Sequence, residues 1–207
     1  MAQSNQIFHE QRNGNRDNYL GTIGGSFKTG SSNVMVSHVG YYMTNAAGLH
    51  RTHHVGIFTS NGSTLLGSAL VPAGAGMVVT NGYSWAALNP PLFLSGGTLY
   101  VVATEVFTSD GDGWPDQTTY TNWNSYFVGT NTWGSSGTNN YLCYYSPSGA
   151  AWPTFPVTSF GPGTMYGSMN MALLPVGAPV VLTPMTNVST FSGVAVAITT
   201  YVNGNIH

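Results

Sequence analysis

Short runs of β-branched and aromatic residues, separated by turn-forming residues, cover most of the chain and constrain its fold more than any other feature. No stretch of three helical turns shows the 3.6-residue period of an amphipathic helix. Asn61-Gly62 stands between two such runs, 55–59 and 64–70, and Asn-Gly in this context is the strongest short-range signal of a β-hairpin. The pattern predicts an all-β, antiparallel, jelly-roll-like β-sandwich of about ten strands without substantial helix.

The predicted strands are rich in Val, Thr, Tyr and other residues that favour extended backbone. They cover residues 34–43, 55–59, 64–70, 77–80, 83–88, 98–107, 119–128, 140–146, 165–174, 180–183 and 194–202. The predicted linkers carry Gly and Pro, at 90–91, 95–97, 135–137, 147–149 and 161–163. We expect a polar arm at 1–20, a sandwich domain at 21–175, and a segment at 176–207 that completes the sandwich or mediates assembly.

Charged residues are scarce, and this scarcity excludes several classes of protein. Only 5% of the 207 residues are charged, four of them basic and six acidic, against about 25% in an ordinary domain. Four basic residues cannot follow a phosphate backbone, which argues against nucleic-acid binding. Intrinsic disorder does not fit a chain that is 13% aromatic. A solvated helical bundle does not fit either, because its outer faces need charge.

The start of the chain bears on where the protein acts. No apolar run approaches the roughly 18 residues that a membrane span requires. No signal peptide is visible: either the protein lacks one, or the chain is a mature domain, and Ala2-Gln3-Ser4 favours the second because it suits a mature N-terminus. We therefore expect a protein that is secreted or held at the cell surface.

Residues 34–107 carry a pattern of strands that resembles a known family. It consists of Val-Gly-Tyr-Tyr at 39–42, a Thr-His to Gly-Ile-Phe strand at 52–58, Gly-Ser-Thr-Leu-Leu-Gly at 62–67, a strand near Trp85, and the segment 94–103. This pattern resembles a bacterial secreted β-sandwich domain of unknown function, found in multidomain surface proteins and beside glycan-active modules. The resemblance implies a jelly-roll-like accessory domain and implies no catalytic activity.

Four of the six acidic residues fall within twelve positions, at Glu105, Asp110, Asp112 and Asp116. Calcium prefers six to eight oxygen ligands, and Asp alternating with Gly lets a tight loop aim several oxygens inward. The loop resembles the calcium loops of thrombospondin type 3 repeats, with Thr108 at the first Asp position. The resemblance implies a structural calcium site at Asp110, Asp112 and Asp116, and the clustering adds Glu105 as a fourth candidate ligand. The alternatives are a plain Asp/Gly turn and, for Glu105 with one of the aspartates, a catalytic carboxylate pair.

Histidines form the second polar cluster. His50, His53 and His54 lie beside Arg51, and His-rich tracts can bind zinc or copper. On a strand, however, His53 and His54 point to opposite faces and cannot bind one ion together. We therefore interpret His53 as a half-buried structural residue that is hydrogen-bonded to a neighbouring loop. His38 is expected in the core or in a cross-strand pair, on the same face as its neighbours Val34, Val36 and Tyr42.

Aromatic residues concentrate from the acidic loop onward, where Trp114, Trp123, Trp133 and Trp152 make up four of the five Trp. A flat aromatic ring can pack on the C–H face of a sugar, while uncharged polar groups bind its hydroxyls. The candidate carbohydrate-binding residues are Trp133, Trp152, Trp114 and Tyr145. The alternative is that these rings fill the core or favour strands.

These patterns predict a non-catalytic extracellular module that binds neutral polysaccharide through exposed aromatics. No nucleophile elbow, phosphate loop, zinc-protease motif or dinucleotide motif is present in the sequence. The alternative is a structural or assembly subunit, such as an adhesin module, a filament protein or a virion decoration protein. Its terminal segments would exchange strands between copies.

Overall fold

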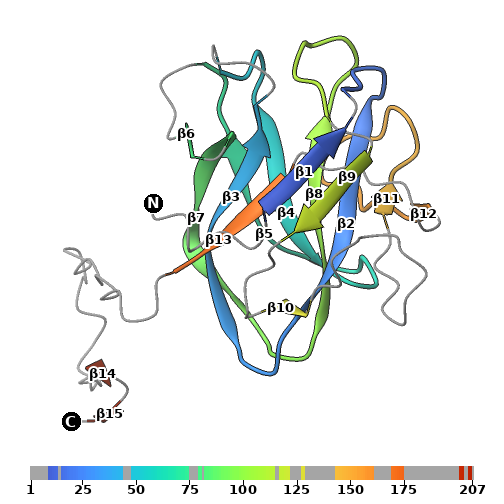
Figure 1. Ribbon diagram of the computed structural model, residues 1–207. Coiled ribbons are helices and arrows are strands. Elements are labelled where there is room, and N and C mark those ends of the chain that lie inside the picture. The colour runs from blue at the N-terminus through green and yellow to red at the C-terminus, as the bar shows by residue number, and fades with distance from the viewer. Residues whose placement is uncertain are drawn as a thin grey trace, which may run out of the picture. The chain divides into compact units, whose positions relative to one another are not determined.

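The computed structural model describes residues 9–13, 15–43, 48–74, 79–80, 82–114, 117–121, 127–128, 143–160, 169–174, 201–202 and 205–206. The chain divides into two units, Met1–Leu174 and Pro175–His207. All regular structure in the described residues is β, with no helix, as the sequence predicts (Figure 1). None of these residues therefore belongs to a helix long and apolar enough to cross a membrane.

The strands are short. They are β1 (His9–Asn13), β2 (Gly21–Thr29), β3 (Val34–Tyr42), β4 (His53–Thr59), β5 (Leu65–Val71), β6 (Val79–Thr80), β7 (Tyr83–Leu94), β8 (Leu99–Val106), β9 (Gln117–Thr121), β10 (Phe127–Val128), β11 (Cys143–Tyr145), β12 (Thr158–Phe160), β13 (Met169–Leu173), β14 (Tyr201–Val202) and β15 (Asn205–Ile206).

Two antiparallel sheets dominate the first unit. The seven-stranded sheet has the order β12-β11-β2-β8-β4-β5, with β10 also paired to β2, and the four-stranded sheet has the order β13-β3-β7-β6. A separate ladder joins β1 to β9. In the second unit the described strands are β14 and β15, which pair with each other.

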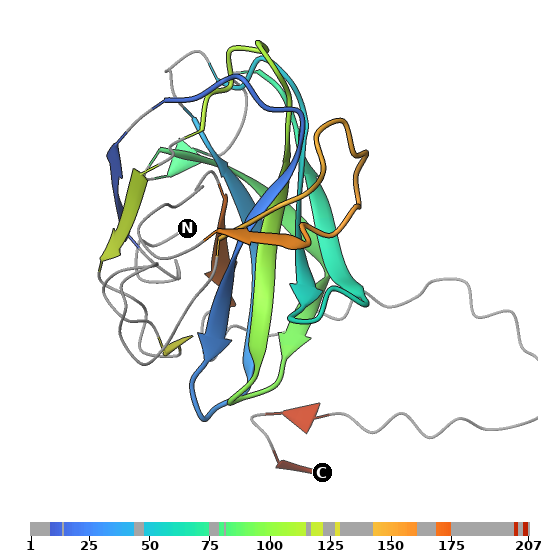
Figure 2. The same cartoon turned by 90° about the vertical axis from the view of Figure 1, so that its right-hand side faces the viewer.

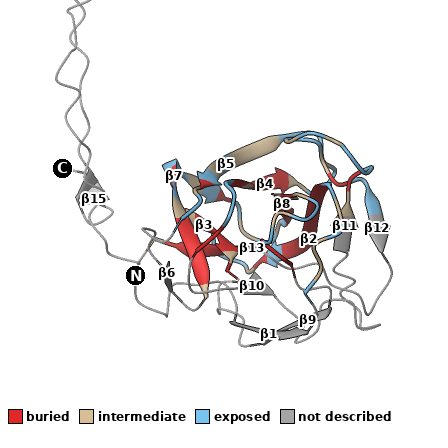
Figure 3. Cartoon of the chain, turned by 90° about the horizontal axis from the view of Figure 1, so that it is seen from above, coloured by how far each residue is buried: buried red, intermediate tan, exposed pale blue. Residues whose placement is uncertain are grey.

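One hydrophobic core joins the two large sheets. Its buried side chains come from β2, β4 and β8 of one sheet and from β3, β7 and β13 of the other. Figure 3 shows these buried segments facing one another. Along β8 the side chains alternate, so that Val102 and Val106 enter this core while Val101 and Ala103 lie on the outer face of the sheet.

The predicted hairpin at Asn61-Gly62 is confirmed, because β4 and β5 pair as antiparallel neighbours on either side of it. Gly62 has φ of 71°, a conformation that glycine adopts without strain.

The sequence prediction missed β2, which lies between β8 and β11 within the larger sheet. Three glycines weaken its strand pattern, yet Gly24 has a packing reason. A Cβ at Gly24 would lie 2.7 Å from the Val102 carbonyl oxygen and 2.8 Å from the Ala103 Cβ. Glycine therefore permits the close approach of β2 and β8 at this point.

Pro90-Pro91, predicted as a linker, belongs to β7. The pairing of β7 with β3 passes from Ala87 opposite His38 to Leu92 opposite Val36. Residues 88–91 therefore bulge out of the ladder. Proline has no backbone N–H, and residues in a bulge do not have to donate a hydrogen bond to the neighbouring strand, so both prolines fit there.

A bulge at Ser37 also corrects the predicted face of His38. Relative to β13, Ser37 is an extra residue between Val36 and His38, so Val36 points into the core and Val39 and Tyr41 again point inward. His38 consequently lies on the face opposite to Val34 and Val36. Its Nδ1 lies 2.9 Å from Ser37 Oγ, and the Ser37 hydroxyl donates to the Ala172 carbonyl. Nδ1 of His38 is therefore a donor to Ser37 Oγ.

Burial lowers the pKa of His38 from its ordinary value of 6.5. The unfolded chain therefore takes up a proton at this position at a higher pH than the folded chain does. We expect His38 to cost stability as the pH falls through about 6.5 toward its lower folded pKa. Thermal unfolding of the wild type and His38→Gln between pH 8 and 5 measures this contribution. The variant should lose less stability on acidification, and an equal loss in both proteins would contradict the expectation.

Candidate metal centre

A buried polar cluster forms where the loop after β8 meets the beginning of β4. His53, the first residue of β4, points to the core side of its sheet, and Asp110 and Asp112 reach it from the loop. Each of the three side chains is at most 4% exposed. One potential ligand atom from each residue lies within 4.8 Å of the others. The group can therefore hold a metal ion.

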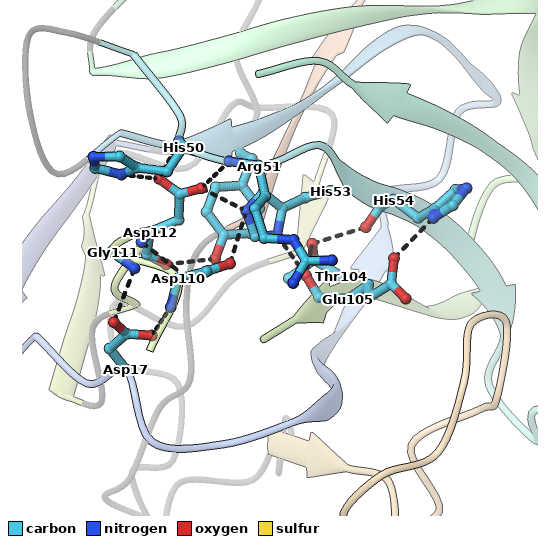
Figure 4. Close-up of polar contacts among 11 residues, drawn as sticks. Asp17, His50, Arg51, His53, His54, Thr104, Glu105, Asp110, Gly111 and Asp112 are labelled. Atoms are coloured by element: carbon cyan, nitrogen blue, oxygen red, sulfur yellow. Dashed lines mark hydrogen bonds and ion pairs between the residues drawn. The ribbon is translucent and has the colours of Figure 1, made fainter. Parts of the chain in front are cut away.

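Asp112 is the centre of this cluster (Figure 4). Its Oδ1 accepts the backbone N–H of His50 at 2.7 Å and lies 3.0 Å from His50 Nδ1. Its Oδ2 accepts the backbone N–H of Arg51 at 2.7 Å and lies 3.0 Å from His53 Nε2. One carboxylate thereby joins three elements: the acidic loop, the segment before β4, and β4 itself.

Tyr41 connects the cluster to the opposite sheet. Its ring stacks on His53 with centroids 4.0 Å apart and planes 19° apart. Its hydroxyl donates to the carbonyl oxygen of Asp112 at 3.0 Å. The cluster therefore lies between the two sheets and contacts both.

Asp110 is fixed by hydrogen bonds to its Oδ1 atom and from its backbone N–H, but not through its Oδ2 atom in the part of the chain that the structure describes. Its Oδ1 accepts the N–H of Asp112 at 2.9 Å, and its own N–H donates to Asp17. Asp17 also accepts the N–H of Gly111, so the segment before β2 closes the acidic loop from the other side. Among the described residues, Asp110 Oδ2 accepts no hydrogen bond, and it lies 3.7 Å from His53 Nε2.

The two aspartates differ in their electrostatics. Burial raises the pKa of Asp110. Burial alone would also raise the pKa of Asp112, but hydrogen bonds from His53, from the backbone N–H groups of His50 and Arg51, and from the His50 ring outweigh it and lower that pKa. Asp112 is therefore the ionised hub of the loop at neutral pH.

The predicted calcium ligands are only partly brought together. Asp110 and Asp112 share the cluster, whereas Asp116 lies outside the described residues. Glu105, a predicted ligand, does not join the cluster, because its Oε2 lies 2.9 Å from His54 Nδ1. Val102 and Val106 of β8 point into the core, and because side chains alternate along a strand, Glu105 points to the outer face with Val101 and Ala103.

His53 is the cluster residue that the acidic-loop pattern did not include. The alternation of β4 correctly placed His53 and His54 on opposite faces, and the predicted bond from His53 to a neighbouring loop is present. The imidazole is fully buried rather than half-buried. No spacing rule connects it to Asp110 and Asp112, because the pairing of β4 with β8 brings them together.

The predicted sugar-binding aromatics occupy different places. Trp114 is 2% exposed and belongs to the shared core, so its ring offers no face to a ligand. Tyr145 is half-buried against the same core, edge-on to Tyr19. Trp133 lies outside the described residues. Trp152 is half-buried and covers the outer face of the larger sheet.

Trp152 belongs to a second polar group on that outer face. The segment after β11 folds back over β4 and β8 (Figure 2), and its Trp152 and Phe155 pack on Phe58. The Trp152 ring stacks on His54, with centroids 5.5 Å apart and planes 7° apart. His54 in turn contacts Glu105, and the two side chains are 39% and 17% exposed.

The fold and the site together define an all-β protein with a buried histidine and two-aspartate cluster between its two sheets. No protein-family model matches the sequence, and no curated protein is significantly similar to it.

Proposed function

We propose that the protein is a non-catalytic, extracellular β-sandwich module that binds neutral polysaccharide. In this proposal the two large sheets form a jelly-roll-like sandwich of about ten strands, as in the secreted domain that residues 34–107 resemble. The polysaccharide lies on the outer face of the larger sheet, at Trp152, His54 and Glu105.

The observation that carries the proposal is the arrangement of these three side chains. Trp152 combines a half-buried ring with a fixed orientation, because it stacks on His54 and packs on Phe58. Glu105 and His54 remain partly exposed beside it. An aromatic surface with adjacent hydrogen-bonding groups suits the alternating C–H and hydroxyl faces of a sugar. A surface with few charges suits a neutral ligand.

The carboxylates support a structural role better than a catalytic one. Asp110 and Asp112 are enclosed, and Asp112 uses both oxygens to fix neighbouring loops. Glu105 contacts His54 on the other face of the sheet. General acid–base cleavage of a glycoside needs two carboxyl groups on either side of a bound sugar. Any ion in the cluster, with calcium as the expectation from the loop sequence, would likewise be structural.

Affinity electrophoresis in native gels that contain laminarin, hydroxyethylcellulose or dextran tests the proposed function. We expect the wild type to be retarded in at least one of these gels. Trp152→Ala should lose about 1–3 kcal/mol of binding free energy, the contribution typical of an aromatic ring stacked on a ligand. His54→Ala should weaken retardation less, because it removes one hydrogen-bonding group and the support of the ring but leaves the Trp152 ring itself.

Phe93→Ala provides the matched control, because Phe93 is an aromatic residue of β7 that is 56% exposed on the other large sheet. It should bind as the wild type does. A thermal melt of each variant separates lost binding from lost folding. Equal retardation of Trp152→Ala and the wild type, or no retardation of the wild type in any neutral gel, would rule out the proposed site.

The second candidate function is assembly through terminal segments. It is supported by the separation of residues 175–207 as a unit of their own and by the exposed cross-strand pair Met35 and Phe93. Sedimentation velocity at increasing concentrations should then show assembly that deletion of residues 180–207 or 1–20 abolishes. A monomer at all concentrations would eliminate this candidate.

A further inference from the structure

We propose that His53 Nε2, Asp110 Oδ2 and Asp112 Oδ2 bind a first-row transition-metal ion of the zinc class rather than calcium. The ion would lie between β4 and the acidic loop and hold them together. Tyr41 of the opposite sheet contacts two of its ligands, because its ring stacks on His53 and its hydroxyl donates to the Asp112 carbonyl. This proposal is independent of polysaccharide binding, because Trp152, His54 and Glu105 lie on the other face of the larger sheet.

The hydrogen bonds of His53 indicate a cation beside its Nε2. Nδ1 lies 3.0 Å from the carbonyl oxygen of Glu105, which can only accept a hydrogen bond, so Nδ1 carries a hydrogen. In a neutral imidazole Nε2 then presents a lone pair. Yet Nε2 faces Oδ2 of Asp112 at 3.0 Å and Oδ2 of Asp110 at 3.7 Å. Three electron-pair donors that converge in this way require a proton or a metal ion among them.

The position of Asp110 favours the metal ion over the proton. Its side chain is 4% exposed, and its Oδ2 accepts no hydrogen bond from the described residues. A proton on His53 Nε2 would serve Asp112 at 3.0 Å but would leave Asp110 at 3.7 Å without a hydrogen bond. Buried carboxylate oxygens are costly without a partner. An ion between the three side chains would engage Asp110 Oδ2 as well.

Charge leads to the same conclusion. A divalent ion bound by neutral His53 and the two ionised aspartates would leave no net charge among the three enclosed side chains. Buried charges are tolerated when they are paired or coordinate a metal.

The spacing of the donors fits the bond lengths of such an ion. Zinc lies about 2.0–2.2 Å from nitrogen and carboxylate oxygen, and its tetrahedral geometry then places adjacent ligand atoms about 3.3–3.6 Å apart. The observed separations of 3.0 Å and 3.7 Å from His53 Nε2 lie close to this range. Small side-chain shifts would therefore bring all three donors to bonding distance.

The surrounding hydrogen bonds have the form of an outer shell around a metal. Metal-binding histidines usually donate their other ring N–H to a carboxylate or a backbone carbonyl, as His53 does to Glu105. Ligating carboxylates are themselves hydrogen-bonded, as Asp112 is by Arg51 N–H and Asp110 by Asp112 N–H. These contacts fix the orientation of all three ligands.

The mixture of donors selects the class of ion. Calcium and magnesium prefer shells made of oxygen, whereas an imidazole nitrogen with carboxylates suits zinc and its neighbours. Glu105, the fourth carboxylate expected for calcium, is committed to His54. The cluster therefore offers too few oxygens for calcium and a suitable set for zinc.

The experiment compares metal uptake by the full chain during refolding, because the site is enclosed and is expected to load as the protein folds. Protein unfolded in chelator is refolded with zinc, calcium or magnesium chloride, or without metal, and is then desalted. Elemental analysis and a thermal melt follow. We expect about one zinc per chain, a raised melting temperature in zinc, and no comparable rise in calcium or magnesium.

Two substitutions locate the ion. Asp110→Asn keeps a carbonyl oxygen for the N–H of Asp112 but weakens the ligand, so it should refold and retain less than a tenth of the zinc. Glu105→Gln is the matched control and should retain all of it. If Asp110→Asn retains zinc at full stoichiometry, if the wild type takes up none, or if calcium stabilises as strongly as zinc, the proposal is wrong.

X-ray absorption of the zinc-loaded wild type gives a result even if Asp110→Asn does not refold. We expect one imidazole nitrogen with oxygen ligands at about 2.0–2.2 Å. A shell with two or more imidazoles would place the zinc on other histidines and overturn the assignment.

Discussion

Asp112→Ala is expected to lower the free energy of unfolding by about 3–5 kcal/mol, even in chelator, because it removes the acceptor of two backbone N–H groups and leaves the buried ring of His53 without its partner. The carboxylate accepts backbone N–H groups from His50 and Arg51 and faces the ring of His53. Asp112 itself is 2% exposed, so the folded protein encloses this carboxylate with its partners. Urea unfolding followed by tryptophan fluorescence measures the effect.

Glu105→Ala is the comparison for Asp112→Ala. Its carboxylate also contacts a histidine, but the pair is partly exposed and should contribute no more than about 1 kcal/mol. If the two alanine variants unfold at similar urea concentrations, Asp112 does not have the central role that its hydrogen bonds indicate.

Gly24→Val should cost about 3 kcal/mol or more, despite the preference of valine for strands. The added Cβ meets the carbonyl oxygen of Val102 at 2.7 Å, and a backbone atom inside a paired strand cannot move aside. The variant must therefore separate β2 from β8, which are neighbours in the larger sheet. Its free energy of unfolding, measured in urea beside the wild type, reports this cost.

Gly67→Val is the same substitution on β5, where the nearest atoms to the added Cβ belong to Leu92, 3.6 Å away. That distance is an ordinary contact, so Gly67→Val should remain within about 1 kcal/mol of the wild type. Equal destabilisation by the two valines would show that strand glycine in general, rather than the close approach at Gly24, sets the cost.

The strands rich in β-branched residues could be predicted from sequence because their pattern is local. The hairpin around Asn61-Gly62 is such a case, since a two-residue signal determines which neighbours pair. The β2 strand could not be predicted in this way. Gly24 permits the close approach to β8, which lies far away in the chain, and no local preference reports such a contact.

The same distinction applies to the site. The acidic residues stood out because the remaining chain has so little charge, and Asp110 and Asp112 do form a cluster. Glu105 is predicted as a ligand because it is near the loop in sequence, but its side chain contacts His54 rather than the cluster. His53 joined the cluster through sheet pairing, and the face of His38 depended on a bulge at Ser37. Bulges and long-range pairing are tertiary features.

Adjacent residues of β4 separate the two proposed sites. His53 contributes to the enclosed cluster, and His54 supports Trp152 on the outer face. We therefore expect zinc loading and polysaccharide binding to respond to different substitutions. Asp110→Asn should leave gel retardation intact in a folded protein, and Trp152→Ala should leave zinc content unchanged.

The position of the sugar is tested most directly by indole NMR signals during titration with oligosaccharides of the polysaccharide that retards the protein. The five tryptophans give five indole signals, and Trp152→Phe assigns one of them. Trp85 and Trp114, which are 3% and 2% exposed, serve as internal references. We predict that the Trp152 signal shifts progressively while both references stay in place. A titration that leaves the Trp152 signal unchanged while the sugar binds would contradict the proposed site.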